Sequence, residues 1–414
     1  MAAKLGQLEA TIHLHDPYRW HYGSDDPVTG VIRLTYQPAS SLFKKQTDTA
    51  DLFGPLKIRS ILFGNCDIKA RRENDLPTLH GIQLLKKPDL VYEGSFKAEV
   101  GRSYDFPFST RFPTGSNMAL GPGYNRSLAL PPTFYSHFSH YPDVIDVRNN
   151  YHLLVDVELP GIDVKLVLPK ESNAPLMRFE LPRPPTSLIE SNKSTSTAAA
   201  TLQSASLLPE DQRPTGFKQK TKAVFTSKHF PMLVFDVTCT EWRYVHPGQS
   251  PTFEISIRRD DSRSSSPTNP EVVLEAFKVE LVGYTVVDTR QRWRGKPMCF
   301  DTETLQTLAC ETALPLTFSK ANDHSHSVRV GQIALFPSTF KHIKVSRTYQ
   351  FKVSMQFKIA GESVKVKQEH DVILVPPPLG PMGGESAAGP SNSGPSRGQV
   401  EEENLPRYED AVAS

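Results

Sequence analysis

The stretch Tyr349-Gln350-Phe351-Lys352-Val353-Ser354-Met355-Gln356-Phe357-Lys358-Ile359 shows the strictest alternation in this chain of 414 residues. Large apolar residues occupy every second position, and Gln, Lys and Ser fill the positions between them. Successive side chains of a β-strand point to opposite faces, so the pattern predicts a strand with one face in a core and the other in water. Gly361-Glu362 then predicts a turn into a second strand at Val364–Val366.

Similar short strands, separated by Gly, Pro and Asp, are predicted through most of the chain. Tyr151–Leu159 alternates apolar and polar residues, and Val164–Leu168 is expected to pair with it across a turn at Pro160-Gly161. Further along, Phe253–Ile257 and Phe277–Leu281 alternate in the same way. No long amphipathic helical pattern interrupts these strands. The sequence therefore predicts an all-β protein built from antiparallel β-sandwiches.

Changes in composition divide the chain. Its length favours two domains, and residues 1–180 and 229–376 are expected to form one sandwich each. Between them, residues 181–228 are dominated by Ser, Thr and Ala and predict a disordered linker, because such a segment buries too little apolar surface to form a core. Residues 377–414, rich in Gly, Pro and Ser, predict a flexible C-terminal tail.

Charge and cysteine content narrow the function classes. Lys and Arg number 47 against 45 acidic residues, a net charge of +2, which argues against a protein that binds nucleic acid through bulk charge. Four scattered cysteines favour a reducing compartment, although a pair between Cys299 and Cys310 stays possible. The N-terminal residues lack an apolar signal region, and no run approaches 18 apolar residues. We therefore expect a cytoplasmic protein whose contact with membranes is peripheral.

Motifs that would indicate catalysis are absent. The sequence has no G-x-S-x-G, H-E-x-x-H or G-x-x-x-x-G-K-[ST]. Asp323-His324-Ser325-His326 could present metal ligands, yet no Cys or His pair at zinc spacing accompanies it, so a polar loop is favoured. The prediction is a protein that is not an enzyme and holds neither a metal nor a cofactor.

The C-terminal stretch Leu405-Pro406-Arg407-Tyr408 has the form of a ligand for a WW domain. Pro406 fixes its own φ and biases Leu405 toward the extended, polyproline-like region, so docking into an aromatic groove costs little entropy. Tyr408 then presents a ring and a hydroxyl group to a neighbouring pocket. The alternative is a charged terminus in which Pro and Tyr occur by chance. Leu405, Pro406 and Tyr408 are the predicted WW-domain-binding residues.

A basic cluster surrounds Trp293 and consists of Arg290, Arg292, Arg294 and Lys296. Guanidinium groups match the geometry of carboxylate and phosphate oxygens, so the cluster could bind acidic cargo segments or anionic headgroups. The favoured interpretation is a solvated loop at the end of a strand whose tryptophan packs against the sandwich.

The order of several segments resembles that of the arrestin family, and specifically of the alpha-arrestins. The matching segments are Tyr22–Leu34 (with Asp26-Pro27-Val28-Thr29-Gly30), Ile58–Gly64, Phe106-Pro107-Phe108, Leu130-Pro131-Pro132-Thr133-Phe134, Val245-His246-Pro247-Gly248-Gln249 and Val372–Pro378. The resemblance spans nearly the whole chain outside Thr186–Lys222. It implies two immunoglobulin-like arrestin sandwiches and no enzymatic activity.

The resemblance also implies a role as an adaptor. Alpha-arrestins recruit WW-domain HECT ubiquitin ligases to membrane transporters or receptors, which are then ubiquitinated and endocytosed, so recruitment to the plasma membrane or endosomes is expected. The ligase-binding role falls on Leu405, Pro406 and Tyr408. The family motif usually has Pro where Leu405 stands, and one clear copy is present. The alternative is an arrestin-fold signalling or sorting scaffold that assembles a receptor complex without directing degradation.

Overall fold

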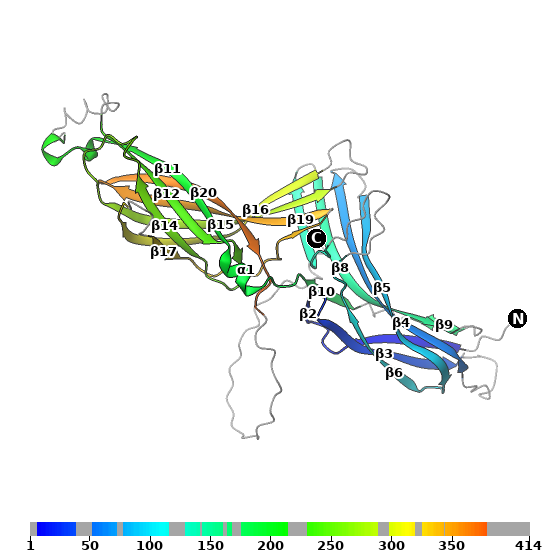
Figure 1. Cartoon of the computed structure of the whole chain (residues 1–414). Coiled ribbons are helices and arrows are strands. Elements are labelled where there is room, and N and C mark those ends of the chain that lie inside the picture. The colour runs from blue at the N-terminus through cyan, green and yellow to red at the C-terminus, as the bar shows by residue number, and fades with distance from the viewer. Residues whose placement is uncertain are drawn as a thin grey trace, which may run out of the picture. The chain divides into compact units, whose positions relative to one another are not determined.

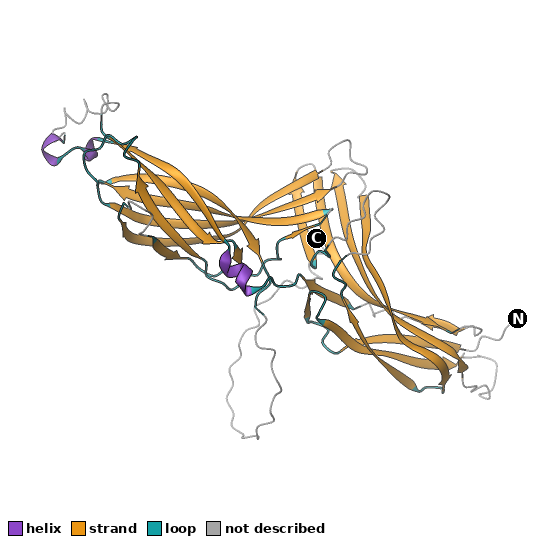
Figure 2. Cartoon of the chain, viewed as in Figure 1, coloured by secondary structure: helices purple, strands orange, loops and turns teal. Residues whose placement is uncertain are grey.

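The computed structural model describes residues 6–38, 52–72, 78–115, 129–140, 143–159, 164–167, 175–213, 230–288, 298–318, 325–342 and 344–378. These residues form two β-sandwiches in tandem, with one short helix and two 3₁₀ turns (Figures 1 and 2). The short helical elements are α1 (Thr186–Ser191), η1 (Ala205–Leu207) and η2 (Glu210–Gln212). The predicted all-β fold of two sandwiches is therefore confirmed.

The first sandwich contains a four-stranded sheet of order β6-β3-β1-β9 and a larger sheet of order β2-β10-β8-β4-β5, on which β7 also pairs with β8. The strands are β1 (Gly6–Leu14), β2 (Trp20–Tyr22), β3 (Pro27–Pro38), β4 (Leu52–Arg72), β5 (Thr78–Ala98), β6 (Ser103–Arg111), β7 (Phe134–His140), β8 (Asp143–Glu158), β9 (Val164–Val167) and β10 (Leu176–Glu180). Its last strand ends at residue 180, where the sequence places the end of the domain.

The second sandwich contains a sheet of order β11-β12-β14-β17 and a larger sheet of order β13-β20-β19-β15-β16, on which β18 also pairs with β19. The strands are β11 (Lys193–Gln203), β12 (Met232–Trp242), β13 (Tyr244–Val245), β14 (Thr252–Arg259), β15 (Val272–Asp288), β16 (Met298–Leu316), β17 (His326–Arg329), β18 (Phe340–Lys341), β19 (Val345–Ile359) and β20 (Glu362–Leu374).

The stretch with the strictest alternation forms most of β19, as its pattern predicts. All six apolar side chains from Tyr349 to Ile359 are at most 1% exposed, and the polar residues between them are half-buried or exposed. Residues 360 and 361 adopt φ values of 49° and 85°, and β20 follows with Ile359 opposite Glu362. The predicted turn and the in/out assignment of the strand are both confirmed.

The prediction of a disordered linker over residues 181–228 is wrong in its central part. Residues 193–203 form β11, which pairs with β12 along its whole length, and Ala200 and Leu202 are buried in the second core. Threonines on this strand are exposed and bond to threonines of the neighbouring strand, as Thr195 does with Thr240 (3.0 Å) and Thr197 with Thr238 (3.0 Å). Small core residues suffice here because the neighbouring strands supply the large ones. Residues 214–229 lie outside the described residues.

The predicted hairpin across Pro160-Gly161 is also wrong. Residues 164–167 form β9, which pairs in parallel with β1 in the other sheet, with Gly6 opposite Val164. The partners of β8 (Asp143–Glu158) are β4, β7 and β10. Because β4 already hydrogen-bonds along one side of β8 from end to end, the chain beyond Leu159 extends the opposite sheet instead.

The two sandwiches are copies of one topology. In chain order, β1–β8 and β10 have the same sheet positions as β12–β19 and β20, and the copies differ in the remaining strand, which is β9 in the first and β11 in the second. The equivalence extends to single residues. Gly64 lies opposite Tyr151 in the first copy, and Gly283 lies opposite Tyr349 in the second.

The clearest duplicated feature is a proline-threonine segment that precedes β7 and β18. The hydroxyl groups of Tyr151 and Tyr349 donate to the carbonyl oxygens of Pro131 and Pro337, each at 2.6 Å. Two residues after each proline, Thr133 and Thr339 accept a hydrogen bond on Oγ1 from the backbone N–H of Phe179 and Leu374, both at 2.9 Å. Each copy thus closes one end of its sandwich in the same way.

Candidate functional site

Residues that the sequence predicts as binding sites lie outside the described residues. This applies to Leu405, Pro406 and Tyr408 in the tail and to Arg290, Arg292, Arg294 and Lys296, which connect β15 to β16. The structure therefore tests neither prediction. The sites that it does describe are a pocket where residues of both sandwiches meet and a buried polar chain inside the second sandwich.

Equivalent residues of the two copies contact each other where the sandwiches meet. The rings of Phe134 and Phe340, at the starts of β7 and β18, pack edge to face with centroids 5.2 Å apart. Val287 and Val345 lie opposite each other at the ends of β15 and β19, yet they belong to the apolar cluster of the first sandwich. The apolar core of the first sandwich therefore includes side chains from strands of the second sandwich.

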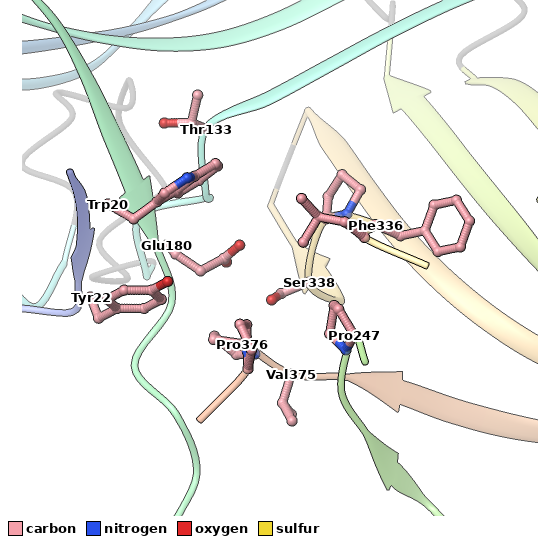
Figure 3. A pocket seen from close by; sticks show the side chains of 12 residues that line it. Trp20, Tyr22, Thr133, Glu180, Pro247, Phe336, Ser338, Val375 and Pro376 are labelled. Atoms are coloured by element: carbon pink, nitrogen blue, oxygen red, sulfur yellow. The ribbon is translucent and has the colours of Figure 1, made fainter. Parts of the chain in front are cut away.

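The pocket has a volume of about 260 Å³ and a mostly apolar wall (Figure 3). Its lining residues are Trp20, Tyr22, Thr133, Glu180, Pro247, Leu335, Phe336, Pro337, Ser338, Val375, Pro376 and Pro377. Trp20 and Tyr22 reach it from the same face of β2, since residues two apart in a strand point the same way. Glu180 is the partner of Tyr22 in the parallel pair of β10 and β2, which brings its carboxyl group beside the tyrosine ring.

Glu180 is the only acidic residue in this lining, which has no basic residue. Its side chain accepts a hydrogen bond from the backbone N–H of Leu181 (2.9 Å), and Ser338 of the second sandwich is close enough to favour its charged form through further hydrogen bonding. Burial raises the pKa of Glu180 to about 7 against these hydrogen bonds, which lower it. The residue is 8% exposed, and no ion pair joins it to a cation among the described residues.

Sequence reasoning missed this pocket because its residues come from six separate segments. A single glutamate after an apolar strand carries no signal of burial. The segments Pro131-Pro132-Thr133-Phe134 and Pro337-Ser338-Thr339-Phe340 do repeat Pro-x-Thr-Phe. That repeat is the one sequence signal that could have indicated that equivalent ends of the two sandwiches face each other.

A chain of buried polar groups lies between β11 and β20 in the second sandwich. The amide nitrogen of Gln368 donates to the carbonyl oxygen of Val237 (2.7 Å), and its amide oxygen accepts from the Ser196 hydroxyl group (2.6 Å). Ser196 Oγ is 2.9 Å from His370 Nε2, and His370 Nδ1 is 3.7 Å from Glu241 Oε1. Burial raises the pKa of Glu241 well above its ordinary value and lowers that of His370.

Ser196, His370 and Glu241 have the composition of a Ser-His-Glu triad, but His370 Nδ1 makes no hydrogen bond to Glu241, and the hydrogen bond between Ser196 and His370 has the wrong polarity. Ser196 gives its single hydroxyl proton to Gln368, so His370 Nε2 must carry a hydrogen and donate to Ser196. A nucleophilic serine requires the reverse, because the histidine must accept the proton from the hydroxyl group. Burial favours the uncharged forms of Glu241 and His370, so the group is neutral, and the hydrogen bonds of Ser196 with Gln368 and His370 hold β11 against β20.

The remaining titratable groups offer no further candidate for chemistry. Within the described ranges, no three His, Cys, Asp or Glu side chains are placed to hold a metal ion. Cys66 and Cys239 are buried and unpaired, and burial raises the pKa of the Cys66 thiol to about 12, which disfavours the reactive thiolate. No helix in the described part of the chain is long and apolar enough to cross a membrane.

Known families and curated proteins offer no match to this chain, either as a family model or as a relative.

Proposed function

We propose that this protein is an arrestin-fold adaptor that brings a WW-domain HECT ubiquitin ligase to membrane-protein cargo. The observation that carries the proposal is the combination of two tandem β-sandwiches with a Leu-Pro-Arg-Tyr stretch at residues 405–408. The sandwiches agree with the order of segments that resembles the alpha-arrestins. The proposed ligase contacts are Leu405, Pro406 and Tyr408.

The mechanism is one of effective concentration and requires no chemistry from the chain itself. Cargo bound to the sandwiches and a ligase bound to the tail become two ends of one complex, so transfer of ubiquitin is effectively intramolecular. Residues 379–404 lie between the described part of the chain and the ligase motif and contain many Gly, Pro and Ser residues. Such a sequence lets a bound ligase reach lysines at different positions on the cargo.

The basic residues between β15 and β16 are the proposed cargo contact. Arg290, Arg292, Arg294 and Lys296 follow the end of β15, whose Val287 lies in the core shared by the two sandwiches. In the proposed adaptor, these residues bind acidic or phosphorylated segments of cargo, and the protein is recruited from the cytoplasm to the plasma membrane or endosomes.

A peptide of residues 401–413 tests the ligase contact by titration calorimetry against a ligase WW domain. We expect micromolar affinity, and Tyr408→Ala should weaken it by about thirtyfold or more, because a buried aromatic anchor contributes roughly 2 kcal/mol. Arg407→Ala is the matched control and should change little. In cells, full-length Tyr408→Ala should still associate with cargo while cargo ubiquitination stops. Equal losses for Arg407→Ala and Tyr408→Ala would contradict the proposal and favour a scaffold that does not direct degradation.

A further inference from the structure

The pocket where the sandwiches meet contains an acid without a counter-ion. Glu180 accepts a hydrogen bond from the N–H of Leu181 and lies beside Ser338, and a carboxylate has about four acceptor sites, so it can still accept a hydrogen bond from a ligand. The charged form of such a group is destabilised by burial, which is why the pKa of Glu180 is raised to about 7. A cation entering the pocket would remove that penalty.

Aromatic rings stand on the same side of the pocket as the acid. Figure 3 shows Trp20, Glu180 and Tyr22 on one side of the pocket and Ser338 facing Glu180 from the other. Burial and the nearby Glu180 raise the pKa of Tyr22, which keeps its hydroxyl group protonated. Trp20 already attracts a cation elsewhere, since the guanidinium of Arg178 lies 6.0 Å from its ring centroid. Aromatic rings beside a carboxylate favour a positively charged group that has an apolar stem.

The mouth of the pocket is open and apolar. Leu335 is 78% exposed and Trp20 is 36% exposed, and both line the pocket. Exposed large apolar side chains around a depression are typical of a surface that meets a partner. Pro376 and Pro377 form part of the pocket wall. Because their rings fix the backbone φ angle, this part of the wall is rigid and the space stays available to a ligand.

We propose that this pocket binds the cationic side chain of a lysine or arginine on a partner polypeptide, with the Glu180 carboxylate as counter-ion and the Trp20 and Tyr22 rings against the side-chain stem. The lining favours a cationic side chain, because it contains one acidic residue and no basic residue. The site is separate from the tail motif, and it binds a basic segment whether or not the tail binds a ligase.

The test uses full-length protein and three small probes: the Nα-acetyl methylamides of arginine, lysine and norleucine. Binding is followed through the Trp20 indole N–H signal in heteronuclear NMR spectra. We expect saturable shifts with the arginine and lysine probes, and at least tenfold weaker binding of norleucine, which has an apolar stem without the charge. Glu180→Gln should weaken the cationic probes at least tenfold, and Glu210→Gln, at an exposed position, should leave them unchanged.

A second variant separates loss of the site from loss of the fold. Tyr22→Leu keeps the carboxylate and the indole probe but removes one ring, and it should weaken the cationic probes about threefold to tenfold. If norleucine binds as tightly as arginine, the pocket is an apolar groove and the proposal is wrong. The proposal is equally overturned if no probe saturates, or if both Glu180→Gln and Tyr22→Leu bind the arginine probe as the wild-type protein does.

Discussion

At the scale of single residues, Glu241 and His370 show how burial makes stability depend on pH. Glu241 has a folded-state pKa above its ordinary 4.5, so its contribution to stability is complete below about pH 4.5 and is lost as the pH rises toward the folded value. His370 has a folded-state pKa below 6.5, so its contribution is present above pH 6.5 and is lost as the pH falls. The two groups therefore change the stability of the protein in opposite directions as the pH moves through the neutral range.

Replacing Glu241 with Gln should remove the contribution of this carboxyl group to the pH dependence of stability. The amide has the shape of the neutral acid and cannot ionise, so the variant should be more stable than the wild-type protein at pH 8, by about 1 kcal/mol or more, the scale of an unsatisfied buried polar group. The gain should shrink as the pH falls to 5.5. Urea unfolding at several pH values measures it. The control is Glu369→Gln on the exposed face of β20. If the stability of Glu241→Gln and of the wild-type protein depended on pH in the same way, Glu241 would not be a buried acid with a raised pKa.

Which side chains are buried was predictable in β19 but not in these polar groups. Tyr349 to Ile359 alternates so strictly that its core face follows from the period of a strand. Gln368 and His370 also occupy inward positions of β20, between Val366 and Val372, and an apolar pattern interrupted by polar residues gives no indication of burial. Their partners Ser196 and Glu241 lie on strands far away in sequence, so only the assembled sandwich reveals the hydrogen-bond chain.

At the scale of elements, β11 is where local composition and structure disagree. Its sequence, Lys-Ser-Thr-Ser-Thr-Ala-Ala-Ala-Thr-Leu-Gln, has little apolar surface, which predicts disorder for an isolated segment. In the sandwich, it covers the edge of β12, pairing Lys193 with Trp242 at one end and Gln203 with Met232 at the other. Threonine favours strands because its branched side chain fits a pleated surface. The strand forms because a partner exists, which the composition of the segment does not reveal.

A comparison of two fragments tests the contribution of β11. Residues 186–378 include the strand, and residues 229–378 begin where composition places the domain boundary. We expect the longer fragment to unfold cooperatively in urea. The shorter fragment should remain largely unfolded, because it lacks the pairing along β12 and the buried side chains of Ala200, Leu202 and Leu207. Circular dichroism follows both. Equal unfolding midpoints would mean that β11 is an accessory strand that the core does not need.

At the scale of the whole molecule, the sandwiches are joined by packing as well as by the chain. Val287 and Val345 of the second sandwich share the core of the first, and Phe134 packs on Phe340. Alternation of apolar and polar residues predicts the strands of each sandwich separately, because it shows only that one face of a strand is buried. It does not report that the ends of β15 and β19 enter a neighbouring core. The contact between the sandwiches was therefore beyond the sequence argument.

A double-mutant cycle measures this contact. Phe134→Ala and Phe340→Ala should each lower the free energy of unfolding by about 2–4 kcal/mol. The double variant should lose less than the sum by about 1 kcal/mol, because the edge-to-face pair is lost only once. Scanning calorimetry or urea unfolding provides the values. The control pairs Phe134→Ala with Phe253→Ala, whose ring packs on Phe277 and Phe351 inside the second sandwich. That pair should be additive, and additivity for Phe134 with Phe340 would contradict a shared core.

The two sandwiches carry different residues at equivalent positions of the junction, which is why the junction has a single acid rather than two. The hydrogen bonds to Thr133 and Thr339 make Phe179 equivalent to Leu374, so Glu180 corresponds to Val375 and Ser338 to Pro132. Two identical copies would have placed a carboxyl group and its serine on both sides of the contact, with like charges in one apolar region. Because both copies belong to one chain, their residues can differ, and here one half carries the acid Glu180 while the other carries Ser338 beside it. The protein therefore has one acidic residue where the sandwiches meet, although the sandwich topology occurs twice in the chain.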